Sequence, residues 1–110
     1  MAKATFDAQS VAVANLLATS PVAPGCVVSK PLLQTDSCKV IVFAMAAGQA
    51  ISEHHAPFIA TVHVLDGRLD LTVSGKRHVL TAGDWLLIPF DVKHDLTAVE
   101  PTRFLLTVMR

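Results

Sequence analysis

Short β-rich segments separated by glycine turns fill most of the chain. The segment 68–73, RLDLTV, alternates polar with apolar residues, as a half-buried strand does. Turns are predicted at 66–67, 74–75 and 82–84, and Pro89 ends a strand. Many short strands at regular spacing, with no alternating helices, predict an all-β sandwich or barrel rather than a parallel α/β sheet. The strands are predicted over 38–45, 58–65, 68–73, about 78–80, 85–88, 94–98 and 103–109.

Composition indicates one folded domain, residues 1–110. Hydrophobic residues make up 52% of the 110 residues and charged residues 16%, which excludes a disordered chain. Some of this apolar surface is expected to lie between subunits. The formal net charge is zero and there is no basic run, so no nucleic-acid partner is predicted. No apolar run approaches the roughly 20 residues of a membrane span, so no membrane partner is predicted either.

The N-terminal region is the one place where a helix is considered. Residues 7–19 are long enough for a helix that Asp7 would cap. Val11 and Val13 alternate with alanines, so an extra strand is the alternative. A proline- and glycine-rich stretch follows. We therefore treat residues 1–25 as an N-terminal arm.

Export and disulfide formation are not expected. The first 23 residues do not fit a signal peptide, because Asp7 separates Lys3 from a short apolar stretch at 11–18. Cys26 and Cys38 lack a C-x-x-C spacing and are predicted to be reduced thiols. Both points predict a cytoplasmic location.

Glycines, histidines and a proline recur at two regular spacings. Gly48 is followed by five residues and then His54, and a further glycine closes the next strand. Gly83 is followed by five residues and then Pro89, with His94 five positions further on. Both spacings resemble the two signature motifs of the cupin superfamily.

The resemblance covers about residues 38–109. It implies a double-stranded β-helix, the RmlC-like cupin jelly-roll barrel, with a short N-terminal helix or an extra strand. The stretch HHAPFIATVHVLDG is similar to the core of small single-domain cupins. Cupins of this kind typically hold Fe, Mn, Ni or Zn on three histidines and one glutamate, and no organic cofactor is implied.

The metal motif is degenerate. Of the usual three histidines and one glutamate, only His54 and His94 align residue by residue. The resemblance therefore implies a pair of ligands rather than a complete set. Four motif positions carry other residues: Ala56 replaces the second histidine, Ala60 the glutamate, Asp91 a glycine and Ala98 an asparagine.

Two further histidines are candidates to complete the set. His55 is adjacent to His54, and neighbouring residues on a regular strand point to opposite faces unless a bulge intervenes. His63 lies between Val62 and Val64, which share a face with Ala60, so it is expected to face outward unless the register differs. The predicted metal ligands are thus His54 and His94, with His63 and His55 as candidates.

A small, largely apolar ligand is predicted in the barrel, and Phe43, Val62, Trp85 and Phe90 are the candidate pocket residues. No catalytic residue is assigned, because neither a Ser/His/Asp order nor a well-placed carboxylate base is found. One interpretation is a metal-dependent oxygenase or isomerase. The alternatives are a metal-free ligand-binding or sensing module, or a dimeric scaffold with a vestigial site. A homodimer is predicted from the high apolar content, with the N-terminal arm supplying an exchanged strand or a packing helix.

Overall fold

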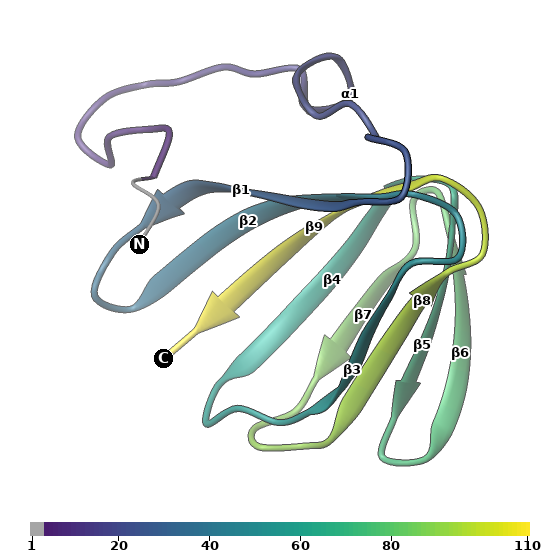
Figure 1. Ribbon diagram of the computed structural model, residues 1–110. Helices are drawn as coiled ribbons and strands as arrows, with labels where there is room; N and C mark the ends of the chain where they lie inside the picture. The colour runs from purple at the N-terminus through teal and green to yellow at the C-terminus, as the bar shows by residue number, and fades with distance from the viewer. Residues whose placement is uncertain (1–3) are drawn as a thin grey trace.

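The structure, a computed structural model that describes residues 4–110, consists of two antiparallel β-sheets that face each other (Figure 1). One sheet has five strands in the order β1-β2-β9-β4-β7, and the other has four in the order β3-β8-β5-β6. The predicted all-β jelly-roll barrel is therefore confirmed. The strands are β1 Val27–Gln34, β2 Cys38–Met45, β3 Ala50–His54, β4 Ile59–Asp66, β5 Arg68–Val73, β6 Lys76–Thr81, β7 Trp85–Ile88, β8 His94–Ala98 and β9 Thr102–Met109.

The hydrophobic core lies between the two sheets. Alternate residues of each strand point into it, so Val62 and Val64 in β4 are fully buried, as are Leu69 and Leu71 in β5. Phe104 in β9 stacks on a phenylalanine of β2, with ring centroids 4.9 Å apart. This packing leaves the opposite face of the five-stranded sheet pointing out of the barrel.

Two strands were not predicted. β1 contains Pro31, and its pairing with β2 shifts register between Pro31 and Leu33, so the regular alternation of a strand is lost. β3 is exposed at four of its five residues and therefore lacks an apolar signal. Both strands are identified only by their neighbours, β2 and β8.

A short N-terminal helix is confirmed, but it is much shorter than the expected helix over 7–19, and residues 7–19 form no strand. The only helix in residues 4–110 is α1, Leu16–Thr19, whose first turn is capped by Asn15 rather than Asp7. The backbone N–H of Ala18 donates to the Asn15 side chain at 3.1 Å. Val11 and Val13 are 98% and 93% exposed, so nothing packs against the alternating valines.

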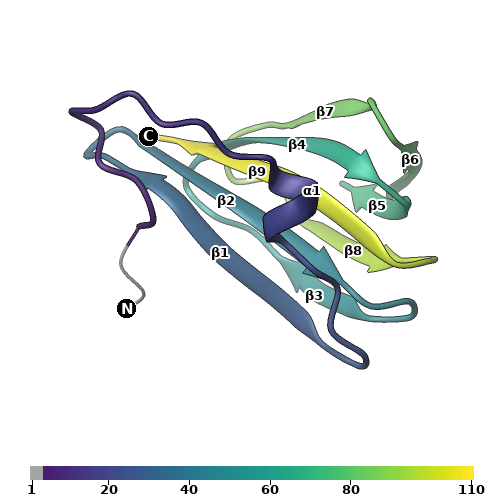
Figure 2. The ribbon, with the colours of Figure 1, turned by 90° about the horizontal axis from the view of Figure 1, so that it is seen from above.

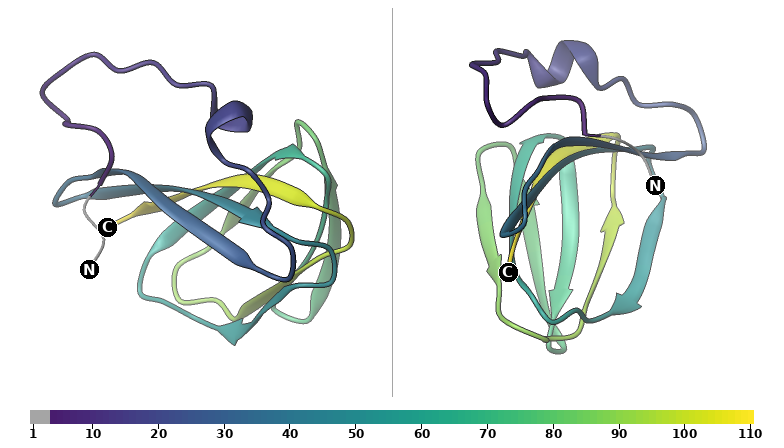
Figure 3. Two further views of the ribbon diagram at one scale, coloured as in Figure 1. Left: turned by 45° about the horizontal axis from the view of Figure 1, so that its top comes forward. Right: turned by 90° about the vertical axis from the view of Figure 1, so that its left-hand side faces the viewer.

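The N-terminal arm folds back over the outer face of the five-stranded sheet. Figure 2 shows α1 lying across β2 and β9, and both views of Figure 3 show the arm on this side of the barrel. Near its start, the backbone N–H groups of Thr5 and Phe6 donate to Pro31 and Leu32, each at 2.9 Å. The arm therefore covers part of the free edge of β1.

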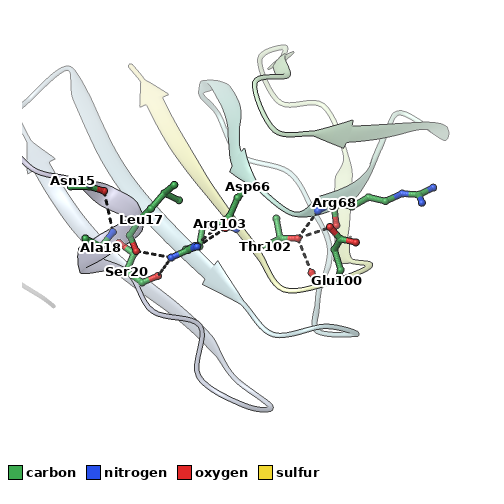
Figure 4. Close-up of polar contacts among 9 residues, drawn as sticks. All are labelled: Asn15, Leu17, Ala18, Ser20, Asp66, Arg68, Glu100, Thr102 and Arg103. Atoms are coloured by element: carbon green, nitrogen blue, oxygen red, sulfur yellow. Dashed lines mark hydrogen bonds and ion pairs between the residues drawn. The ribbon is translucent and has the colours of Figure 1, made fainter.

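A single arginine fastens the end of the arm to the barrel. Arg103 in β9 donates through Nη1 to the carbonyl oxygens of Leu17, at 2.6 Å, and Ser20, at 3.5 Å (Figure 4). Its Nε and Nη2 atoms form a two-point contact with the Asp66 carboxylate. These hydrogen bonds from Arg103 hold the pKa of Asp66 below its usual value. The contacts of Arg103 thus join α1, β4 and β9.

Two expectations from composition concern the thiols and the membrane. Cys26 and Cys38 are free thiols, the first exposed and the second half-buried. Among the described residues, no helix combines the length and apolar character needed to cross a membrane.

Candidate metal and ligand site

His54 and His94 meet at one end of the barrel. They are direct partners in the antiparallel pairing of β3 with β8, and this pairing shifts register between Ile51 and His54. Side chains directly opposite each other across two strands share a face. The two rings lie edge to face, with centroids 4.2 Å apart and planes inclined by 64°. The structure therefore brings together the two histidines that match the motifs.

Each ring is held by the backbone carbonyl of the residue two positions before it in the chain. His54 Nδ1 lies 2.8 Å from the carbonyl oxygen of Ser52, and His94 Nδ1 lies 3.0 Å from that of Val92. A carbonyl oxygen only accepts, so each Nδ1 carries the proton in the neutral ring. Each Nε2 then has a free lone pair, which is the form of imidazole that binds a metal ion.

A small cavity of about 80 Å³ opens beside the two histidines. Ala56 and Ala60 both line it, and these are the positions where the cupin motif has its second histidine and its glutamate. The two substitutions therefore replace two potential ligands with methyl groups. No carboxylate is among the residues that line the cavity, which are His54, Ala56, Phe58, Ala60, Ile88, Pro89, Val92, His94 and Val108.

His55 does not line this cavity. Its Nδ1 donates to the Asp91 carboxylate at 2.6 Å, and both side chains are about half exposed. Asp91 adopts a positive φ of 57°, a conformation that aspartate tolerates better than most residues, at the position where the motif has glycine. Its backbone N–H donates to the Ala56 carbonyl at 3.0 Å. His55 and Asp91 thus join the loops on either side of the cavity.

His63 is on the wrong side of the sheet to join His54 and His94. It is exposed and pairs with Trp85 in β7 and Leu105 in β9, on the outer face. Its neighbours Val62 and Val64 are buried in the core, as the period of two along the strand predicts. No group of three or more potential metal ligands occurs in residues 4–110.

The four residues predicted to line the pocket lie elsewhere. Phe43 stacks on Phe104 within the core, and Val62 is fully buried there. Trp85 and Phe90 are each 61% exposed, and neither lines the cavity. None of the four therefore lines the cavity beside His54 and His94: Phe43 and Val62 fill the barrel, whereas Trp85 and Phe90 face solvent.

Sequence reasoning missed several residues that line the cavity. Val108 reaches it because β9 pairs with β4 and places Val108 opposite Ala60, a contact between distant parts of the chain. Phe58 lines it from the loop before β4, and the Arg110 guanidinium lies 5.2 Å from its ring centroid. The only usable signal for Val108 was its alternation along the last strand.

Comparison with known proteins assigns the family. A sequence model of the cupin domain matches residues 41–109, well over half of the chain. This chain is a cupin. The match begins within β2 and ends in β9, so the N-terminal arm and β1 lie outside it. The resemblance noted from the two motifs is thereby confirmed for the family and the fold.

Individual relatives do not share one activity. A curated relative, polyketide synthase CurC from Streptomyces cyaneus, is 39% identical over 51 residues, and this match spans 46% of the cupin and about a third (33%) of the relative. The conserved protein SPY1581 of unknown function from Streptococcus pyogenes is 25% identical, with a TM-score of 0.87 over 99% of this chain and 96% of that one. A putative mannose-6-phosphate isomerase from Ralstonia eutropha JMP134 is 27% identical, with a TM-score of 0.79 over 90% and 98% of the two chains.

Proposed function

We propose that the cavity beside β3 and β8 binds a small, largely apolar molecule and that His54 and His94 together hold a divalent metal ion there. The observation that carries this proposal is the pair of Nδ1 contacts to backbone carbonyls. They orient two neighbouring rings, 4.2 Å apart, and leave both Nε2 atoms as lone-pair donors. A metal ion such as Fe, Mn, Ni or Zn accepts imidazole nitrogens of this kind.

The donor set fits an open, weakly held ion. Catalytic zinc sites typically use three protein ligands, and this cavity offers two neutral imidazoles with no carboxylate. Such an ion would keep positions open for water and for an oxygen of the bound molecule. When bound, such an ion supplies Lewis-acid polarisation of a carbonyl or hydroxyl group, and an open site of this type serves isomerases and oxygenases.

The chain's own residues select the molecule. Ala56, Ala60 and Ile88 line the cavity with apolar side chains, which favour an apolar body. No lysine or arginine is among the lining residues, so a sugar phosphate is not the ligand that we propose. A volume of about 80 Å³ admits only a small molecule or the end of a larger one.

Metal analysis of the purified protein tests this proposal. We expect His54→Ala and His94→Ala to lower the affinity for Ni²⁺ or Zn²⁺ at least about 10-fold, since changes to the outer shell alone have effects of about 10- to 100-fold. His63→Ala is the matched control, because His63 lies on the outer face, and it should bind as the wild type does. Equal losses in all three variants, or no binding by the wild type, would contradict the metal site.

Restoring the missing ligands gives the complementary test. Ala56 and Ala60 line the cavity, so Ala56→His and Ala60→Glu place a histidine and a carboxylate beside His54 and His94. We expect the double variant to bind the metal at least about 10-fold more tightly than the wild type. No gain in a folded double variant would show that the pocket does not form a metal site.

A metal-free binding module is the second candidate. Its support is the absence, among residues 4–110, of any group of three potential ligands. In this case a small apolar compound should raise the melting temperature of the protein equally with and without a chelator. Stabilisation that needs the metal favours the first candidate instead.

We further propose that the protein is a homodimer that pairs through the outer face of β4, β7 and β9. Trp85 is 61% exposed there and Leu87 48% exposed, on the same face as Leu105 and Met109. Large exposed apolar side chains that share a face are typical of subunit contacts.

Sedimentation velocity tests the dimer: Trp85→Glu should convert it to a monomer. Val79→Glu is the control, since Val79 is 41% exposed on the other sheet, and a wild-type monomer would refute the proposal.

A further inference from the structure

A second cavity, of about 190 Å³, lies between the N-terminal arm and the outer face of the five-stranded sheet. It is on the opposite side of this sheet from the histidine cavity. Lys30 and Val42 are cross-strand partners on the outer face, whereas Lys39 pairs with Val108 on the face that carries the histidine cavity. The residues that matter for its chemistry are Ser20, Ala23, Val28, Lys30, Val42 and Ala44.

The cavity combines an apolar lining with two polar groups that lack partners. Val42 and Ala44 form its floor and are almost fully buried. Lys30 is half-buried at its wall, and no ion pair among residues 4–110 involves its ammonium group. Ser20 is only 7% exposed, and its hydroxyl is buried with no hydrogen-bond partner among the described residues. Buried polar groups usually have a partner, so the Ser20 hydroxyl awaits one, and the half-buried ammonium group of Lys30 is free to form an ion pair.

We propose that this cavity binds a short-chain monocarboxylate, with the alkyl chain against Val42 and Ala44 and the carboxylate at Lys30. A carboxylate gives the ammonium group a charge-assisted partner, and the apolar lining favours a hydrocarbon tail. The volume holds about six water-sized groups, which corresponds to a chain of about four to six carbons. One cation among apolar residues matches a single negative charge and not a polyphosphate.

Binding at this position would also fasten the arm. The cavity has one wall from the arm, at Ser20 and Ala23, and the other from β1 and β2. The backbone carbonyl of Ser20 accepts a hydrogen bond from Arg103, so the ligand lies beside the contact that holds the arm on the barrel. A ligand that binds only the docked arm stabilises this state by mass action. The carboxylate should therefore slow proteolysis within residues 7–19.

Titration of the full chain with hexanoate and butanoate, followed by ¹H–¹⁵N NMR, tests the site. We expect the largest shifts at Ser20, Ala23, Val42 and Ala44. Lys30→Met keeps the length of the side chain but removes its charge, and it should weaken hexanoate binding about 10-fold. Lys39→Met is the matched control: it is also half-buried, on the adjacent strand but the opposite face, and should bind as the wild type does. Hexan-1-ol should bind the wild type as weakly as hexanoate binds Lys30→Met.

Several results would overturn the proposal. Shifts centred on Ala60 and Val108 would place the carboxylate in the histidine cavity instead. Equal losses in the two lysine variants, or equal binding of hexanoate and hexan-1-ol by the wild type, would remove the role of Lys30. The Ala23→Leu variant fills the cavity, so undiminished hexanoate binding by this variant would show that hexanoate binds elsewhere. If the signals of Ser20, Ala23, Val42 and Ala44 shift with protein concentration alone, a second copy of the chain occupies the cavity.

Discussion

Gly67→Ala is expected to destabilise the protein by about 3 kcal/mol or more. Gly67 has a φ of 89°, a conformation that costs an L-residue about 1–2 kcal/mol. A Cβ atom built there lies 2.5 Å from Thr102 Oγ1 and 2.7 Å from Thr102 Cα, and it also collides with the Pro101 carbonyl. Such overlap costs roughly another 1–3 kcal/mol. Urea unfolding measures the loss.

The collision matters because Thr102 is a fully buried polar residue. Its hydroxyl accepts from the Arg68 N–H at 2.9 Å and lies 2.7 Å from the Glu100 carbonyl, to which it can donate (Figure 4). Displacing the hydroxyl leaves the part-buried N–H of Arg68 without this acceptor. Gly83→Ala is the control: its φ is 91°, but a Cβ atom there meets nothing within 4 Å. It should cost only about 1–2 kcal/mol, and equal losses at the two sites would show that strain alone is responsible.

Arg103→Ala is expected to release the N-terminal arm and to cost about 2–3 kcal/mol of unfolding free energy. The guanidinium group joins the carbonyl of Leu17 to the carboxylate of Asp66, and it is 21% exposed. Hydrogen bonds to charged groups contribute about 1.5–3 kcal/mol each, less where water competes. Faster cleavage within residues 7–19 by a dilute protease, together with urea unfolding, measures the two effects.

Arg103→Lys separates charge from geometry, because lysine keeps the charge but cannot contact both groups with a planar fork. We expect it to recover only part of the loss. Acid provides a second readout. The pKa of Asp66 is lowered in the folded protein, so its contribution is present above its unfolded pKa of about 3.9 and is lost as the pH falls through the lower folded value. In Arg103→Ala the free energy of unfolding should fall less steeply as the pH is lowered in this range. The same fall as in the wild type would contradict the role of the Arg103–Asp66 pair.

The strands that could be predicted are those whose signal is local. β2, β5, β7 and β8 begin and end at the predicted residues, because each alternates or is strongly apolar and is bounded by turn residues. β1 and β3 were missed, since a strand with Pro31 or with exposed residues is stabilised by its neighbours rather than by its own pattern. The helix expected over 7–19 is reduced to Leu16–Thr19, because Val11 and Val13, which would extend its apolar face, are exposed.

The amino-acid sequence by itself determined the family, the barrel and the pairing of His54 with His94. Turn glycines and motif spacings act over a few residues, so they can be recognised without knowing which strands meet. Tertiary structure alone decided that His55 contacts Asp91 and that Ala60 and Val108 line one cavity. It also decided that Arg103 holds the arm at Leu17, a contact 86 positions apart in the chain. Such contacts depend on how the two sheets and the arm pack, which no local pattern in the sequence encodes.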